Sequence, residues 1–252
     1  SAPITGGILW GNASNASDPG LCGMPLLSEK HAAETLYIPH LAVENGWWTG
    51  VGFINFRDHA ATITLEGFQS NGQLVASDNL IIAGKGKWCD LIQHAFADWR
   101  NSVAWVKVTA DRPIAGFQIF GREKTQMAAM RLQQPDDLDT ELHVSLPAAQ
   151  DSRWSGIGLL NPGNNSTPIL IETYDEAGHL LKPPEEWQLG LLERNHNRVA
   201  LTEQFFSQGL PNGTAYLVIK AENGETEIGG MGLYQAAESQ GFDRLCVSPF
   251  KQ

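Results

Sequence analysis

The sequence predicts an all-β protein made of two tandem, duplicated antiparallel β-sandwich domains of about seven strands each, with one short helix per copy. Three observations lead to this prediction: a motif that occurs twice, short runs of β-branched and aromatic residues, and a composition rich in turn residues. The chain has 252 residues, of which 42% are hydrophobic and only 18% are charged. This length suits one large or two ordinary domains, and this hydrophobic content is enough for a sizeable core.

The repeated motif is the strongest of the three observations. The segment WWTGVGFINF begins at Trp47, and the segment WSGIGLLNP begins at Trp154 about a hundred residues later. A constant offset aligns the motif residues Trp48, Gly50, Gly52 and Asn55 with Trp154, Gly156, Gly158 and Asn161. The match continues through Glu66 and Glu172, Phe68 and Tyr174, and, after a few inserted residues, Trp105 and Tyr216. This spacing is too long for a solenoid repeat and indicates two copies of a whole domain.

Short strand-like segments follow one another in each copy. Ile63 and Leu65 alternate with threonines, which is the period-2 pattern of a half-buried strand. Turn residues separate such segments, as expected for an antiparallel sandwich. A short helix is predicted in DLIQHAFADW, capped by Asp90, and another in TEQFFSQG, capped by Thr202 and ended by Gly209. The two helices fall at equivalent places in the two copies.

Four segments are therefore predicted along the chain. Residues 1–34 form an irregular N-terminal segment, and residues 35–125 form the first β-sandwich repeat. Residues 126–140 connect it to the second repeat, which spans residues 141–252.

The motif, written W-[ST]-G-[IV]-G-x-[IL]-N-[P], resembles a repeat found in bacterial secreted and surface proteins, a largely uncharacterised group. The resemblance covers roughly residues 35–122 and 141–236, and Phe56 departs from the pattern where the second copy has Pro162. It implies a β-sandwich fold and a secreted, periplasmic or cell-surface location. It brings no catalytic residues with it.

Charge and hydropathy exclude several classes of partner. The net charge of −11 disfavours nucleic acid and anionic membrane surfaces, because both need clustered Lys and Arg. No apolar run is long enough to span a bilayer, so no membrane insertion is expected. The first ten residues, SAPITGGILW, lack the features of a signal peptide, so any such peptide is expected to have been removed.

The sequence contains no familiar catalytic motif. A GxSxG elbow, an HExxH helix, a Walker loop and a GxGxxG turn opening a helix are all missing. The seven histidines are scattered, and none shows the spacing of metal ligands. We therefore expect no enzyme activity and no cofactor, apart from a calcium ion that an acidic run could hold. That run contains Asp136, Asp137, Asp139 and Glu141, but it lacks the ordered spacing of an EF-hand, which favours a solvated linker instead.

Cysteines allow one disulfide hypothesis. Cys22 and Cys246 lie near opposite ends of the chain, and the termini of compact domains are often close together, so these two could form a bridge. The alternative is that all three cysteines are small buried hydrophobic residues.

Tryptophans are the candidate ligand contacts, because flat aromatic faces stack on sugar rings. Trp47, Trp99 and Trp187 are the candidates, and Trp47 stands out because Arg153 replaces it in the second copy. Strand periodicity puts Trp48 on one face with Gly50 and Gly52. Either a ligand enters this glycine strip or an aromatic side chain fills it. Trp105 and, in the second copy, Tyr216 are the candidate fillers, because they recur in both copies. We favour the filled strip, which makes Trp48 a core anchor.

The leading hypothesis is a non-catalytic secreted or cell-surface binding or adhesion module whose partner is a protein or a glycan. One alternative is a hydrolase with a carboxylate or histidine site at the interdomain cleft. Another is a structural accessory module of a surface assembly. An enzyme should bring titratable groups with perturbed pKa values together in a cleft, whereas a binder should present a shallow aromatic platform or an exposed edge strand. Oligomeric state is not predicted.

Overall fold

The computed structural model describes residues 6–11, 21–99, 102–122, 126–146, 152–186, 190–206, 209–236 and 244–249. These residues form antiparallel sheets and short 3-10 helices, which confirms the predicted all-β class. Among them, no helix is long and apolar enough to cross a membrane. The chain divides into a first unit, residues 1–69 and 74–135, and a second unit, residues 70–73 and 136–252. The division after residue 135 falls inside the connection predicted at 126–140.

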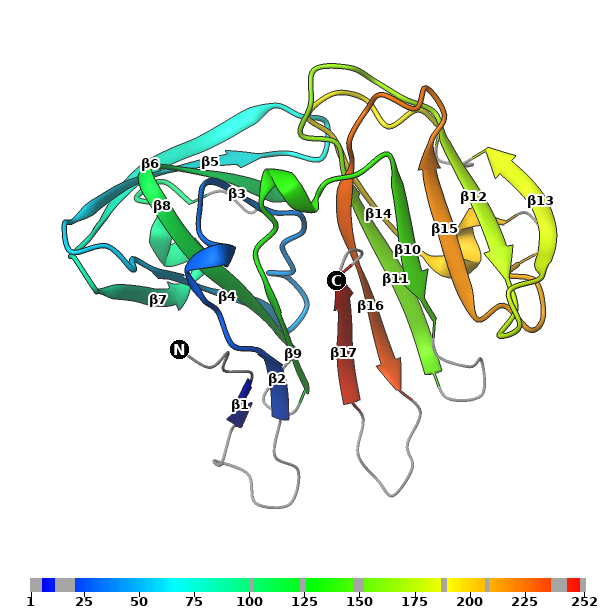
Figure 1. Ribbon diagram of the computed structural model, residues 1–252, viewed down its shortest axis with the longest axis horizontal. Coiled ribbons are helices and arrows are strands. Elements are labelled where there is room, and N and C mark those ends of the chain that lie inside the picture. The colour runs from blue at the N-terminus through cyan, green and yellow to red at the C-terminus, as the bar shows by residue number, and fades with distance from the viewer. Residues whose placement is uncertain are drawn as a thin grey trace. The chain divides into compact units, whose positions relative to one another are not determined.

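The long strand β8 organises the first unit because it belongs to two sheet layers. Its first part pairs with β3 and β5, and its second part pairs with β4 and β9. The layers run in the orders β3–β8–β5–β6 and β9–β8–β4–β7 (Figure 1). The strands are β3 (Ala33–Ile38), β4 (Trp47–Ile54), β5 (Ala61–Phe68), β6 (Leu74–Ile82), β7 (Lys87–Leu91), β8 (Trp105–Arg122) and β9 (Gln126–Arg131).

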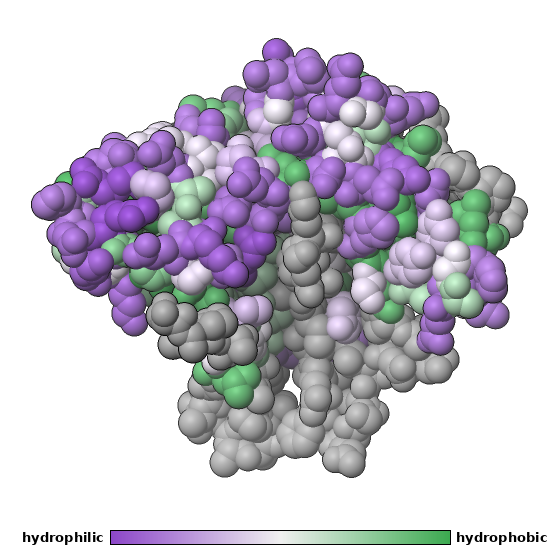
Figure 2. Space-filling view, viewed as in Figure 1, coloured by the Kyte–Doolittle hydropathy of each residue, from purple (hydrophilic) through white to green (hydrophobic). Residues whose placement is uncertain are grey.

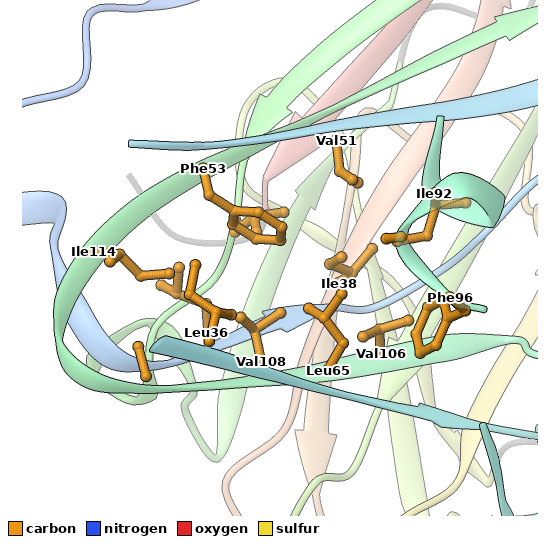
Figure 3. Packing of buried hydrophobic residues seen from close by; sticks show 14 of the residues in the cluster. Leu36, Ile38, Val51, Phe53, Leu65, Ile92, Phe96, Val106, Val108 and Ile114 are labelled. Atoms are coloured by element: carbon orange, nitrogen blue, oxygen red, sulfur yellow. The ribbon is translucent and has the colours of Figure 1, made fainter. Parts of the chain in front are cut away.

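A hydrophobic core fills the space between these two layers. Figure 3 shows Val51 and Phe53 of β4 pointing toward Leu65, Val106 and Val108 of the opposite layer. The period-2 pattern predicted for β5 is confirmed, since its alternate residues are fully buried and the threonines between them are not.

Eight strands build the second unit in two further sheets. One sheet has the order β10–β15–β12–β13, and the other has the order β14–β11–β16–β17 (Figure 1). The strands are β10 (Glu141–Ser145), β11 (Ser152–Leu160), β12 (Ile169–Tyr174), β13 (Leu180–Glu186), β14 (Asn197–Leu201), β15 (Tyr216–Ala221), β16 (Gly229–Ala236) and β17 (Arg244–Pro249). The buried residues include Leu142, Ile157, Ile171 and Leu217, one from each of four strands.

The two units share one pairing scheme. Strands β3, β5, β6, β4, β7 and β9 of the first unit take the same places as β10, β12, β13, β11, β14 and β17 of the second. The first and second parts of β8 take the places of β15 and β16. This agreement is what a duplication predicts, and it extends to the register, because Phe68 lies opposite Trp105 as Tyr174 lies opposite Tyr216.

Two local predictions differ from the structure. The strand β9 lies inside the range 126–140 that was expected to be a connection. The segment 1–34 is not irregular throughout: it contains the hairpin of β1 (Gly7–Gly11) and β2 (Leu21–Pro25). Cys22 and Met24 of this hairpin pack against Ala129 of β9.

The predicted helices are present at equivalent places, but as single 3-10 turns. They are η2 (Ile92–Ala95) and η5 (Thr202–Phe205); the others described are η1 (Glu29–His31) and η3 (Pro135–Asp137). Their N-caps are Leu91 and Leu201, so the predicted caps Asp90 and Thr202 are wrong. After one turn the backbone becomes extended at Phe96 and at Phe206, and both side chains belong to the hydrophobic cores.

Hydrophilic residues cover most of the described surface in the view of Figure 2. The large hydrophobic side chains that are exposed are spread over several strands, and they include Leu9, Ile81, Leu180 and Val199. Scattered exposed hydrophobic residues are normal in folded proteins and mark no site by themselves.

Candidate functional site

The motif asparagines hold loops together in both units. The Asn55 amide donates to the carbonyls of His59 (2.8 Å) and Ala83 (3.2 Å), and its oxygen accepts from Arg57 N–H (2.9 Å). Asn161 repeats this arrangement with the carbonyls of Asn165 (2.8 Å) and Leu192 (3.2 Å) and with Gly163 N–H (3.0 Å). Both side chains are buried. In each unit the motif asparagine therefore joins two loops through its side-chain hydrogen bonds.

The glycine strip of the first motif is filled by aromatic side chains. A Cβ atom at Gly52 would lie 2.4 Å from the Phe117 ring, and one at Gly121 would lie 2.0 Å from the Trp48 ring. Trp48 lies on the face of β4 opposite to Val51 and Phe53, so it covers the outside of the sheet and is only partly buried. The prediction that Trp105 fills the strip is wrong, because Trp105 stacks on Phe68 in the other layer, with ring centroids 4.3 Å apart. The same prediction for Tyr216 is also wrong, because Tyr216 stacks on Tyr174 in the sheet that does not contain the motif strand β11.

The second motif has a different neighbour at its tryptophan. The Trp154 indole Nε1–H donates to Gln235 Oε1 at 2.5 Å, within the pair β11–β16. The hydroxyl of Ser155 bonds to the hydroxyl of Thr202 at 2.6 Å and so ties the motif to η5. In the first unit, Thr49 instead exchanges two hydrogen bonds with the backbone of Ala42.

Two of the three tryptophans predicted as ligand contacts lie among the described residues, and each packs against another side chain. The Arg122 guanidinium lies over the Trp47 ring, 5.8 Å from its centroid, and covers one of its faces. Trp99 is partly buried against the core beside Phe96. Trp187 lies outside the described residues.

The acidic run does not form a metal site. No group of three or more His, Cys, Asp or Glu side chains suited to a metal ion occurs among the residues that the structure describes. Asp137 is buried in η3, and Asp139 pairs through its backbone with Ile228. Asp136 is exposed, and the Glu141 carboxylate lies close to Lys220 and His143. The calcium prediction gains no support from this geometry.

Cys22 is buried and forms no disulfide with a described cysteine, and its bridge to Cys246 stays a prediction. Burial raises the pKa of the Cys22 thiol to about 11, so it stays protonated at neutral pH. The side chain of Cys246 is outside the described part of the structure.

The site best supported by the structure is a face whose residues carry no motif in the sequence. Strand periodicity places side chains of β10, β12 and β15 on the outer face of their sheet, where they are exposed or partly exposed. We call this surface the tyrosine face; its residues are Glu141, His143, Glu172, Tyr174, Tyr216 and Lys220.

Three rings line up across the tyrosine face. Tyr174 and Tyr216 are stacked with centroids 5.0 Å apart and planes only 4° from parallel. His143 stacks on the other side of Tyr216, with centroids 6.4 Å apart and an angle of 20°. The row therefore runs from the edge strand β10 across β15 to β12. Such stacked rings present a rigid surface with polar tips.

A chain of polar contacts runs beside the rings. Glu172 Oε2 accepts a hydrogen bond from the Tyr174 hydroxyl at 2.8 Å and lies 3.0 Å from Lys220 Nζ. Lys220 Nζ also lies 3.4 Å from Glu141 Oε2, and Glu141 Oε1 lies 3.0 Å from His143 Nε2. Every member of this chain has a partner, which holds the surrounding rings in place.

These contacts keep the charged groups charged. Burial raises the pKa of Glu172, but hydrogen bonds from Lys220 and Tyr174 outweigh it, so the net pKa is lowered. The hydrogen bond to Glu172 raises the pKa of Lys220, and the same carboxylate raises the pKa of the Tyr174 hydroxyl. At neutral pH the face therefore carries a carboxylate, an ammonium and a neutral phenol.

This coupling gives a testable result. In Lys220→Met we expect the pKa of Glu172 to rise, because the burial that raises it remains while its main hydrogen-bond donor is lost. An NMR titration of the Glu172 carboxyl carbon measures this change. The matched control is Lys107→Met, which removes a partly buried lysine from the equivalent sheet of the first unit and should leave Glu172 unchanged. An unaltered pKa in Lys220→Met would show that Lys220 does not hold this carboxylate.

The first unit carries a counterpart of the tyrosine pair, in which one ring is fully buried. Phe68 and Trp105 stack at the register position of Tyr174 and Tyr216, and Trp105 is only 1% exposed. The repeat had already aligned these four residues in sequence. What the sequence lacked was any sign that one ring of the pair, Trp105, is buried in the first copy, whereas both rings are partly exposed in the second.

Comparisons with known proteins add little. No family model matches the chain, and no curated protein matches it. A solved structure described as "Structure of allantoicase" is 9% identical, covers 86% of this chain and 74% of its own, and has a TM-score of 0.19. A likeness at this level carries no argument about fold or function.

Proposed function

We propose that the protein is a non-catalytic binding module that uses the tyrosine face to contact a carbohydrate. The observation that carries this proposal is the row of parallel rings, Tyr174, Tyr216 and His143, beside a chain of ionised and hydrogen-bonding groups. A shallow aromatic platform of this kind is what separates a binder from an enzyme, which needs a cleft with converging titratable groups.

The chemistry of the face suits a sugar. The rings are stacked on one another, so the edges of the row and its outermost ring faces give an apolar surface for the C–H groups of a pyranose. Neighbouring carboxylate and ammonium groups bond its hydroxyls. Glu141 and His143 have side chains that are 46% and 60% exposed, so their remaining hydrogen-bonding positions face solvent. Because the rings are already stacked, little side-chain entropy would be lost on binding.

Acid–base catalysis is less well supported. A general acid or base works best when its pKa lies near the working pH. The pKa of Glu172 is lowered and that of Lys220 is raised, so both move away from neutrality. These shifts favour a binding role over an acid–base role for the tyrosine face. A secreted, periplasmic or cell-surface location belongs to the same proposal and rests on the motif resemblance.

Substitution of the central ring tests the proposal. We expect the wild type to bind one or more oligosaccharides on a glycan array, and Tyr216→Ala to weaken that binding by roughly tenfold, as expected for one lost aromatic contact. Tyr216→Phe should keep most of the affinity, because it preserves the stack on Tyr174.

The matched control is Trp47→Ala, which removes a partly buried aromatic side chain from the first unit and should leave glycan binding unchanged. Absence of binding by the wild type to any glycan, or equal binding by Tyr216→Ala, would overturn the proposal.

A further inference from the structure

The edge strand β3 of the first unit is closed by another segment of the same unit. Tyr37 N–H donates to the Gln133 carbonyl at 2.7 Å, and Gln133 N–H donates to the Tyr37 carbonyl at 3.2 Å. Leu132, next to Gln133, is only 2% exposed and belongs to the core. This segment thus satisfies the outward N–H and C=O groups of Tyr37, and Leu132 adds one apolar side chain to the core.

The strand β10 occupies the place of β3 in the second unit. Tyr37 lies opposite Lys107 on β8, and His143 lies opposite Val218 on β15, so His143 is the counterpart of Tyr37. In each case the strand is at the edge of its sheet layer. The alternation of exposed Glu141, His143 and Ser145 with buried Leu142 and Val144 is regular along the whole strand.

The outward backbone groups of β10 can be identified from its flanking hydrogen bonds. Thr140 accepts from Ala221 N–H at 2.8 Å, and Leu146 donates to Ala215 at 2.9 Å. The even-numbered residues from 140 to 146 therefore form their backbone hydrogen bonds with β15 and the residues that flank it. The N–H and C=O groups of Glu141, His143 and Ser145 point away from the sheet. Among the described residues, none forms a backbone hydrogen bond with these outward groups.

We propose that the edge of β10 that faces away from β15 binds an extended peptide segment of another protein, which adds to the sheet as a further antiparallel strand with one residue opposite His143. Strand addition to an exposed sheet edge is a general mode of peptide recognition, in which backbone hydrogen bonds give affinity and alternate side chains give specificity. This interaction goes beyond the proposed glycan binding, because it uses the backbone of β10 and not the tyrosine rings.

The surroundings of the edge define the chemistry of the peptide. The residue opposite His143 lies on the same face as Glu141 and Glu172, two carboxylates that share the single ammonium of Lys220. A basic side chain fits that position, and the chain's net charge of −11 also favours a basic partner. The preceding residue points toward the buried side of β10, where Leu142 is 1% exposed, so it should be apolar, as Leu132 is in the first unit.

A peptide based on the closing segment of the first unit tests this proposal with the intact protein. The probe copies residues 126–134 with the change Gln133→Lys, which places an apolar residue before a basic one. We expect saturating peptide to slow amide hydrogen exchange at His143 and Ser145 by roughly tenfold or more, with little change at Leu142 and Val144, which already bond to β15. The same peptide with an N-methyl group on its lysine loses the required backbone N–H and should not bind.

Two variants of His143 separate backbone from side chain. His143→Ala keeps the outward N–H and should bind the peptide about as well as the wild type, whereas His143→Pro removes that donor and should bind roughly tenfold more weakly. The N-methylated peptide gives the same comparison on wild-type protein, even where the proline variant does not fold. Equal binding of the N-methylated peptide would overturn the proposal. So would slow exchange at His143 and Ser145 in the protein alone, which would show that the edge is already closed.

Discussion

Asn55→Ala is expected to lower the free energy of unfolding of the first unit by about 2–4 kcal/mol, and Asn161→Ala should do the same for the second unit. Each asparagine is buried and joins two loops through several hydrogen bonds. Alanine removes these bonds and leaves backbone carbonyl and N–H groups buried without their partner, which costs more than the bonds themselves contribute. Chemical denaturation, followed by hydrogen exchange at amides of each unit, measures the two effects separately.

Asn79→Ala is the control for this prediction. Asn79 is exposed on β6 and accepts one hydrogen bond from the Thr64 hydroxyl at 2.8 Å, so its loss should change stability by less than about 1 kcal/mol. Equal losses of unfolding free energy for Asn55→Ala and Asn79→Ala would contradict the role of the motif asparagines in joining the loops. A loss confined to one unit's asparagine would show that the two motifs are not equivalent.

Acid should destabilise the first unit through His40. Its ring stacks on buried Phe120 with centroids 6.0 Å apart, and its Nδ1 is buried without a hydrogen-bond partner among the described residues. Burial lowers the pKa of His40 from 6.5 to about 4. Between these two pH values the unfolded chain binds a proton that the folded chain excludes. Stability is therefore complete above pH 6.5 and falls by about 3 kcal/mol as the pH decreases to 4.

His40→Phe should remove this part of the acid sensitivity, because phenylalanine keeps the stack on Phe120 and does not titrate. Denaturation midpoints of the first unit between pH 4 and pH 7 measure the effect. The control His59→Gln replaces an exposed histidine and should leave the pH dependence as in the wild type. An unchanged slope in His40→Phe would mean that other groups cause the acid sensitivity.

The sequence was most informative where a side chain reports directly on its backbone environment. Alternating Ile63 and Leu65 predicted a half-buried strand, and β5 has this pattern of burial. Such patterns are local, so they need no knowledge of the neighbouring strands.

Predictions that depended on neighbours were less successful. Trp105 was assigned to the glycine strip because it recurs, but only the register shows that Phe117 lies over Gly52 and that Trp105 lies over Phe68. The tyrosine face was missed for the same reason. Its six residues come from three strands that are distant in sequence, and their types are ordinary for a sheet surface until the pairing brings them together.

The two units differ in one feature that bears on engineering. In the first unit, β8 continues for 18 residues through both layers, so an inserted peptide there would interrupt a strand that pairs on both sides. In the second unit, the same path is interrupted between Ala221 and Gly229, where the exposed residues Asn223 and Gly224 form a turn. Loop tips of this kind tolerate added chain, so a reporter peptide or a tag should be accepted at Gly224 without loss of either sheet.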